Sequence, residues 1–302
     1  MGRPQFLQFV VVREVPAGRG SGVLVSPLLA ALFALSAAAA WGSGDLTGGL
    51  AARRIGAFRT VLVSYSVGLL VLAIVALALG EMLPSPADLL WGAAAGLAGV
   101  VGLGFLLRGF SEGRMGIVAP VSAVLATSIP VIVSVFAEGM PRALQLVGFG
   151  LALAGLWLLS RPERLGGRPG GLGVALLAGV GFGTFFVALD QVGTSAVCWP
   201  LAAGRLAALA VMIPVALVRR QSVVPRGAAL GLLLLVGVLD AAGNLFFLLA
   251  TQTGRLDVAA VLASLYPAVT ALLAWLIAGE RMTRLQVVGA TAAIVAIVLI
   301  TI

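Results

Sequence analysis

The sequence predicts an all-α membrane protein whose ten transmembrane helices form two inverted five-helix repeats. Three observations predict this fold class. First, 61% of the 302 residues are hydrophobic and only 10% are charged, whereas an ordinary soluble domain is about 25% charged. Second, the chain contains ten apolar runs long enough to cross a bilayer. Third, the second half of the chain repeats the first half at one constant spacing.

The N-terminal residues 1–26 differ from the rest of the chain. They hold four charged residues and one apolar stretch, FLQFVVV, which is short for a signal-peptide core and lacks a clear cleavage site. We expect a disordered tail here. Pro27 then suits the first turn of the first span.

The apolar runs are predicted to be helices, because lipid offers the backbone no hydrogen-bond partners. About 20 helical residues cross a hydrocarbon core. The connections are short and carry glycine, proline or charge, as in LGEMLPSPAD after the second run and RRQSVVPRG after the seventh. The predicted spans are 28–47, 60–80, 87–107, 116–137, 143–160, 172–190, 197–218, 228–250, 257–278 and 285–302.

Internal repetition appears when the sequence is shifted by 141 residues, which places Gly42 on Gly183 and Gly96 on Gly237. The same shift places LQLVG, which begins at Leu144, on LQVVG, which begins at Leu285. Because one shift serves from the first span to the last, we interpret the repetition as a duplication. The predicted organisation is a first repeat, a linker and a second repeat at 27–160, 161–171 and 172–302.

Each half holds five spans, so the second half enters the membrane from the opposite side. Inverted repeats are a recurrent plan of secondary transporters, in which the two halves exchange inward-facing and outward-facing shapes around a central site. The sequence therefore predicts a secondary-active transporter that moves a small-molecule substrate by alternating access. A passive channel or a structural membrane subunit is the alternative.

Enzymatic activity is not expected. The chain has neither histidine nor lysine, its acidic residues are scattered, and it has no phosphate-binding loop. An intramembrane lipid-modifying enzyme is therefore the least favoured function. We expect no cofactor and no metal, and the single cysteine, Cys198, excludes an intramolecular disulfide.

The net charge of +8 comes from 19 arginines against 11 acidic residues. Most of these charges fall between the apolar runs, a pattern that suits anionic lipid headgroups better than nucleic acid. The expected partners are thus the lipid bilayer and a small solute, with no nucleic acid. No feature of the sequence predicts an oligomeric state.

Three segments resemble the EamA-type members of the drug/metabolite transporter superfamily. They are the loop GSGDLTGGLAARRIG, the segment VFAEGMPRALQLVGFGLALAGLWLLS at the end of the first half, and LASLYPAVTALLAWLIAGERMTRLQVVGATAAIVAIVLI at the end of the second. The most specific part is the pattern of Pro267, Gly279, Glu280, Arg281, Gln286 and Gly289. In the first half, Gly139 stands at the position of Glu280, preceded by Glu138, and Ala126 stands at that of Pro267.

The resemblance implies a ten-span carrier of the cell (inner or plasma) membrane that exports an amino acid, a metabolite or a drug-like solute. It also implies that both termini lie in the cytoplasm. The arginines favour the other orientation, because most of them lie in odd-numbered connections and the positive-inside rule would then place both termini outside.

Two ionisable residues lie deep inside predicted spans, Arg205 in the seventh and Asp240 in the eighth. The two helices run antiparallel, and both residues fall about 12 to 15 Å from the same membrane face at 1.5 Å per residue. An ion pair between them is therefore predicted. Asn244 lies one turn from Asp240, on the same helical face and with Phe247 close by.

Two interpretations of this group stay open. In the structural one, Arg205 and Asp240 lock two helices and Asn244 adds a hydrogen bond between helices. In the functional one, they line a central cavity where Arg205 holds an anionic substrate group and Asp240 holds a cation or a proton. Ionisable groups cost about 2.5 to 3.5 kcal/mol at a bilayer centre on insertion scales, which favours a role in function.

Further candidates for substrate binding come from the spans that open each half. Trp41 and Asp45 are expected towards the end of the first span, with Phe182 and Asp190 in corresponding parts of the sixth. Their rings would line the substrate path or belong to an interfacial belt, and their carboxylates would reach water. Tyr266 precedes Pro267, and a proline-induced break often borders a binding site in carriers.

Overall fold

The computed structural model describes residues 27–112, 115–160, 171–219, 230–278 and 283–302. All regular secondary structure in these residues is helical. The predicted tail at 1–26, nearly all of the predicted linker, and Gly279, Glu280 and Arg281 lie outside the described residues. The helices are α1 (Pro27–Ile55), α2 (Ala57–Ala78), α3 (Pro86–Ser111), α4 (Met115–Glu138), α5 (Ala143–Ser160), α6 (Leu172–Asp190), α7 (Cys198–Val218), α8 (Leu230–Thr253), α9 (Leu256–Ala263), α10 (Tyr266–Ala278) and α11 (Arg284–Thr301).

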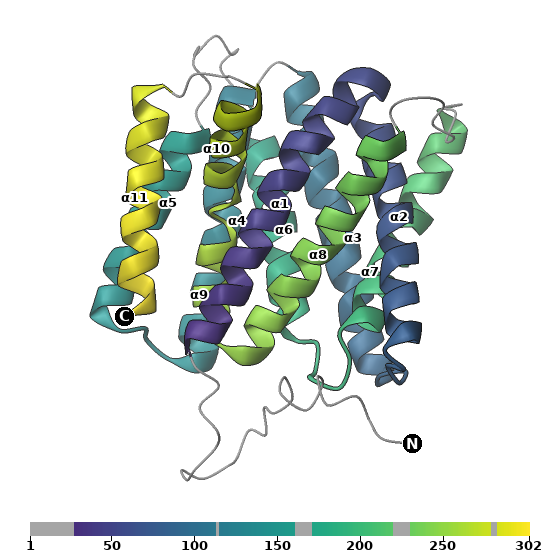
Figure 1. Cartoon of the computed structure of the whole chain (residues 1–302), viewed down its shortest axis with the longest axis horizontal. Coiled ribbons are helices and arrows are strands. Elements are labelled where there is room, and N and C mark those ends of the chain that lie inside the picture. Colours follow the sequence, from purple (N-terminus) through teal and green to yellow (C-terminus); the bar gives the residue numbers. More distant parts are fainter. Residues whose placement is uncertain (1–26, 113–114, 161–170, 220–229, 279–282) are drawn as a thin grey trace.

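Ten segments of the described chain are long and apolar enough to cross a membrane, and α9 and α10 together form the ninth. The predicted fold class is confirmed. Successive spans run in alternate directions, so α1 begins and α11 ends on the same face of the molecule, at the bottom of Figure 1. We call this the terminal face, and the other the opposite face.

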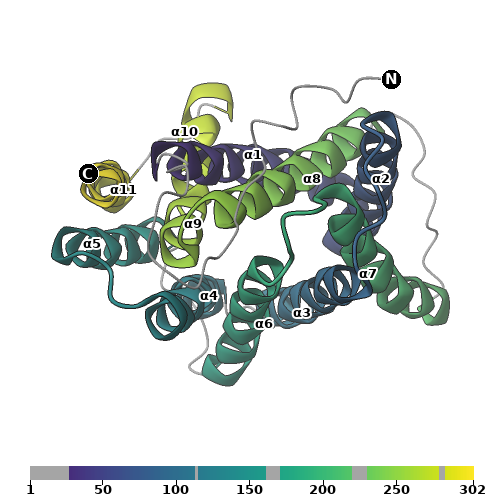
Figure 2. The same ribbon diagram turned by 90° about the horizontal axis from the view of Figure 1, so that it is seen from below.

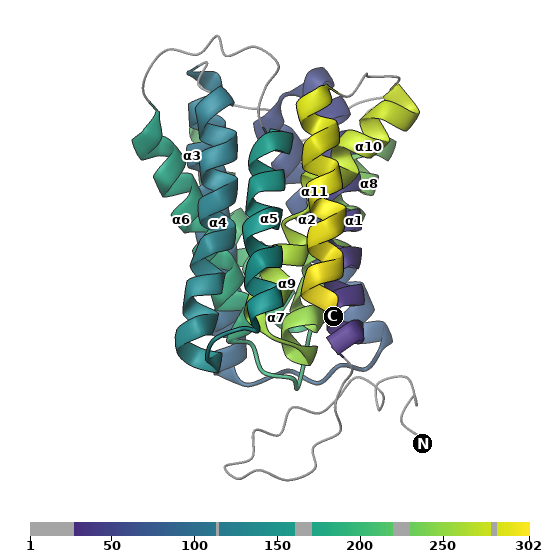
Figure 3. The same cartoon turned by 90° about the vertical axis from the view of Figure 1, so that its left-hand side faces the viewer.

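The packing of the helices follows the internal repeat. Helix α1 packs on α8, and the corresponding helices α6 and α3 pack on each other. Helix α6 packs on α4, and its counterpart α1 packs on α9 and α10, which together correspond to α4. The two remaining pairs join a helix to its own counterpart: α5 packs on α11, and α2 packs on α7. Figure 2 shows these last two pairs at the two ends of the molecule, and Figure 3 shows α5 beside α11.

Repeat-related residues also make corresponding contacts. A Cβ atom built on Gly243 would collide with the ring of Trp41, and one built on Gly102 would lie 3.2 Å from the ring of Phe182. Gly102 and Gly243 are related by the shift of 141 residues, as are Trp41 and Phe182. The duplication is thus visible in side-chain packing, with glycines that allow each aromatic ring to lie against a helix backbone.

Helix α1 is longer than the sequence predicted. The sequence predicts a first span that ends at residue 47 and a loop over GSGDLTGGLAARRIG, but α1 continues to Ile55. Gly44 and Gly48 face α8, where a Cβ atom on either would be 3.6 Å from a side chain of that helix, an ordinary contact distance. Arg53 and Arg54 in the last turn stabilise its C-terminal end through the helix dipole.

The ninth span is broken, as predicted from Pro267. Helix α9 ends at Ala263 and α10 begins at Tyr266. Proline has no N–H to donate to the carbonyl four residues earlier, here that of Ala263. The chain between the two helices turns through shorter-range bonds, from Leu265 N to Leu262 O (3.2 Å) and from Ala268 N to Leu265 O (2.9 Å). Every residue of α9 is buried, so this half-helix lies wholly inside the protein.

Candidate functional site

The predicted ion pair between Arg205 and Asp240 is present. Arg205 Nη2 lies 2.5 Å from Asp240 Oδ2, and both atoms are shielded from solvent. The Arg205 side chain is only 9% exposed, against 25% for Asp240. The guanidinium carbon also lies 4.2 Å from the centre of the Tyr65 ring, a cation–π contact. The Asp240 carboxylate therefore neutralises the Arg205 guanidinium, and the Tyr65 ring covers it.

Asn244 lies next to this pair but does not act as the structural interpretation predicted. Its Nδ2 donates to the backbone carbonyl of Asp240, one turn earlier in α8, at 2.6 Å. A hydrogen bond from Asn244 to another helix is absent from the described residues. The amide finds its partner within its own helix, where the i to i+4 spacing places side chain and carbonyl together.

Trp41 and Asp45 lie deeper in α1 than the sequence predicted. Since α1 extends to Ile55, Trp41 is its middle residue and Asp45 lies well before its end. Trp41 contacts three aromatic rings of other helices at centroid distances of 5.9, 5.9 and 6.4 Å, those of Phe186, Phe247 and Tyr266. Trp41 thus belongs to an interior aromatic cluster and not to an interfacial belt.

The aromatic residue that the sixth span brings to this cluster is Phe186. The sequence pointed to Phe182, whose ring lies instead against Gly102 of α3. The ring of Phe186 packs closely against that of Phe247 in a tilted arrangement, with ring centroids 4.7 Å apart. The internal repeat could have indicated Phe186, because the shift of 141 residues aligns it with Asp45.

Asp45 is an accessible carboxylate inside the bundle. It lies one turn from Trp41 on the same face of α1, and close enough to Asp240 and Tyr266 for electrostatic interaction. Since Trp41 faces α6, α8 and α10, the exposed Asp45 side chain faces the bundle interior rather than lipid. Within the described residues, its carboxylate takes part in no hydrogen bond or ion pair.

Asp190 does not join this group. It is the last residue of α6, at the terminal face, and the Nε2 of its neighbour Gln191 lies 3.5 Å from its Oδ2. Of the seven predicted site residues, six therefore lie together in the interior, and Asp190 lies apart. The six are Trp41, Asp45, Arg205, Asp240, Asn244 and Tyr266.

Carboxylates of the first repeat hold backbone N–H groups of the second repeat at the terminal face. Glu81 accepts hydrogen bonds from Cys198 N (3.1 Å) and Trp199 N (2.9 Å) at the start of α7. Asp88 accepts one from Gly193 N (2.7 Å) in the connection before α7. The first four N–H groups of a helix lack partners within it, so Glu81 satisfies donors that would otherwise be unpaired.

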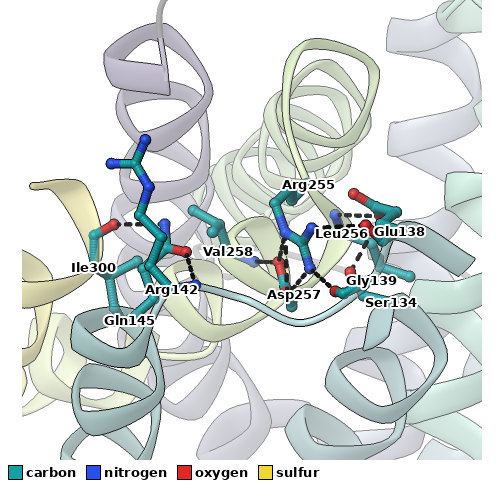
Figure 4. A network of polar contacts seen from close by, with 10 residues as sticks. All are labelled: Ser134, Glu138, Gly139, Arg142, Gln145, Arg255, Leu256, Asp257, Val258 and Ile300. Atoms are coloured by element: carbon teal, nitrogen blue, oxygen red, sulfur yellow. Dashed lines mark hydrogen bonds and ion pairs between the residues drawn. The ribbon is translucent and has the colours of Figure 1, made fainter. Parts of the chain in front are cut away.

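A second contact of this kind joins α4 to α9 (Figure 4). Glu138 Oε1 accepts a hydrogen bond from Leu256 N (3.1 Å), while Arg255 donates to the carbonyls of Glu138 (3.2 Å) and Gly139 (2.8 Å). Arg255 is also paired with Asp257 at 2.7 Å, and this hydrogen bonding raises its pKa above the ordinary value. The guanidinium therefore stays charged, and the two repeats are tied together at the terminal face.

Ten spans in two inverted repeats, with charged and aromatic side chains meeting midway along them, define the inverted-repeat class of membrane transporters. Comparison with known families agrees: the model of the EamA-like transporter family matches residues 28–161 and again residues 169–302. The chain belongs to the EamA-like transporter family. The resemblance inferred from the sequence is confirmed, and the protein is a multi-pass membrane transporter of the drug/metabolite transporter superfamily.

A solved structure described only as "Crystal structure of protein" has the same fold. It matches with a TM-score of 0.72 and 20% sequence identity, covering 89% of this chain and 95% of its own. No curated protein sequence matches the chain.

Proposed function

We propose that this protein is a secondary-active transporter that exports a small metabolite, amino acid or drug-like solute across the cell membrane by alternating access. The observation that carries the proposal is the accessible Asp45 carboxylate inside the bundle, beside the rings of Trp41 and Tyr266. An unpaired carboxylate in a membrane interior is costly, and such groups mark substrate and ion pathways.

In this proposal, Asp45, Trp41 and Tyr266 contact the solute. The Arg205–Asp240 pair and the buried Asn244 lie next to this group, and Asp240 is near enough to Asp45 to interact with it electrostatically. The broken span supports this location, because discontinuous helices border the binding sites of many inverted-repeat carriers. Tyr266 opens α10 directly after the break.

Alternating access requires contacts at one face to break while those at the other form. The hydrogen bonds of Glu81, Asp88 and Glu138 join the two repeats at the terminal face. We propose that these contacts close the terminal face in the conformation described here and open when the repeats rock against each other.

Proton coupling is the proposed energy source. Two carboxylates and one guanidinium meet in the interior, so Asp45 can exchange a proton for solute while Asp240 remains matched by Arg205. The chain itself has no nucleotide-binding loop to supply ATP drive.

The experiment begins with a thermal-shift screen of the purified protein against amino acids, metabolites and cationic dyes, because a ligand that binds the folded state stabilises it. Uptake of a binding solute is then measured in proteoliposomes with and without a proton gradient. We expect Asp45→Asn to abolish the stimulation by the gradient. Asp190→Asn makes the same chemical change outside the interior group and should leave it intact.

Two outcomes would change the proposal. Loss of stimulation in Asp240→Asn with full stimulation in Asp45→Asn would assign the proton to the Arg205 pair. Equal stimulation in the wild type and both variants would remove both carboxylates from coupling.

A further inference from the structure

The charges in the bundle interior are unequal. Away from the span ends, the described charged side chains are Asp45, Arg205 and Asp240. Arg205 and Asp240 neutralise each other in an ion pair shielded from solvent. The carboxylate of Asp45 is left without a positively charged partner among the described residues.

An anionic group would find little positive surface here. The Arg205 side chain is 9% exposed, it is paired with Asp240, and it lies against the Tyr65 ring. A Cβ atom on Gly68 of α2 would lie 3.5 Å from its Nε, so the α2 backbone also covers the side chain. Releasing Arg205 to hold an anion would leave Asp240 unpaired, which is strongly unfavourable in a desolvated position.

The surroundings of Asp45 suit a cation with an apolar body. Trp41 lies one helical turn away, and Tyr266 presents its ring edge-on to Trp41 at a centroid distance of 6.4 Å. Aromatic faces attract cations and cover apolar groups at the same time. Phe186 and Phe247 also pack against Trp41, each at a centroid distance of 5.9 Å, and hold its ring in place.

A metal cation is a poorer match. Hard cations need several oxygen ligands, and the described residues contain no group of three or more His, Cys, Asp or Glu side chains that could hold a metal. One free carboxylate next to aromatic rings offers charge compensation and apolar contact but few ligands.

We propose that the interior site takes an organic cation, whose positive charge pairs with Asp45 and whose apolar body packs against Trp41 and Tyr266. This inference rests on the proposed function, because it names the solute class of the same site. It replaces the anion-holding role that the sequence suggested for Arg205 with a structural one, in which Arg205 neutralises Asp240.

The test is direct binding of radiolabelled tetraphenylphosphonium to the purified full-length protein in detergent. Tetraphenylborate has nearly the same shape and the opposite charge, so it controls for apolar binding. We expect the cation to bind with at least tenfold higher affinity than the anion. Asp45→Asn should lower cation affinity at least tenfold, and Asp45→Glu should retain most of it.

Two variants complete the test. Trp41→Ala should weaken cation binding severalfold, whereas Asp190→Asn should bind as the wild type does. The melting temperature and the gel-filtration elution volume of each variant are compared with those of the wild type, so that a misfolded variant is recognised. Equal affinity for the two ions, absence of cation binding to the wild type, or unchanged binding in Asp45→Asn would overturn the inference.

Failure of this inference is distinguishable from failure of the proposed function. If tetraphenylphosphonium does not bind but another solute undergoes saturable exchange in proteoliposomes, the solute class is wrong and the transport function stands. If the cation binds through Asp45 but no solute is exchanged, the site is correct and the proposed function fails.

Discussion

Two aspartates lie inside the bundle, and their surroundings give them different properties. Asp240 faces a guanidinium 2.5 Å away, and that guanidinium is itself covered by Tyr65. Asp45 has no such partner among the described residues and stays exposed. A charge that is paired and shielded stabilises contacts between helices, while a charge that is accessible can bind and release a solute.

The Arg205–Asp240 pair should be strongly coupled in stability. Removing one partner leaves the other as an unmatched charge, at a cost of about 3 kcal/mol or more. We expect Arg205→Leu and Asp240→Leu each to lower the melting temperature in detergent markedly, and the double variant to recover much of the loss. Additive effects in this double-mutant cycle would show that the pair is not energetically coupled.

Sequence reasoning found most of these residues because charged groups stand out in apolar runs. It placed Asp45 too close to a span end, because the predicted first span ends at residue 47 whereas α1 continues to Ile55. It missed Tyr65, since a tyrosine in a span gives no pattern that reveals which side chain it will contact.

At the scale of helices, glycine decides how closely the spans approach. Cβ atoms on Gly92 or Gly96 would collide with the backbone of α7 at Pro200 and Gly204. Helices α3 and α7 therefore pack backbone against backbone, and α7 brings Arg205 within reach of Asp240. The glycines four residues apart were recognisable in the sequence, but the partner helix was not.

The start of α7 provides a reporter for the terminal face. Cys198 is the chain's one cysteine, it is buried, and its backbone N–H is held by Glu81. We expect Glu81→Ala to release the start of α7 and to increase the rate of Cys198 modification by a water-soluble maleimide at least tenfold.

The control for this experiment is Glu112→Ala, which removes a carboxylate at the end of α3 on the opposite face, where Glu112 pairs with Arg108. Its modification rate should match that of the wild type. If Glu81→Ala also reacts at the wild-type rate, the Glu81 contacts do not keep the terminal face closed.

At the scale of the whole molecule, the fold followed from the sequence because the bilayer limits the alternatives. Apolar runs must be helices, five spans in each half require inversion, and one constant shift relates the halves. The arrangement of charge breaks this symmetry. The repeat equivalents of Asp45, Arg205 and Asp240 are the uncharged residues Phe186, Ser64 and Gly99. The helices are therefore repeated in the two halves, but the charged residues of the site are not.

The cross-repeat contacts at the terminal face were beyond the reach of sequence reasoning. Glu81 lies in a short connection and Glu138 is the last residue of α4, positions where a carboxylate usually meets solvent. That they bind the first N–H groups of α7 and α9 depends on how the two repeats come together, which no local pattern encodes.

Counterflow in proteoliposomes tests whether the protein moves its solute by alternating access through the Asp45 site. Liposomes loaded with unlabelled solute, chosen from the thermal-shift screen, are diluted into a trace of labelled solute. We expect transient, saturable accumulation of label with the wild type and with Asp190→Asn, and none with Asp45→Asn. Simple equilibration without accumulation would indicate a channel, and undiminished accumulation in Asp45→Asn would contradict the role of Asp45.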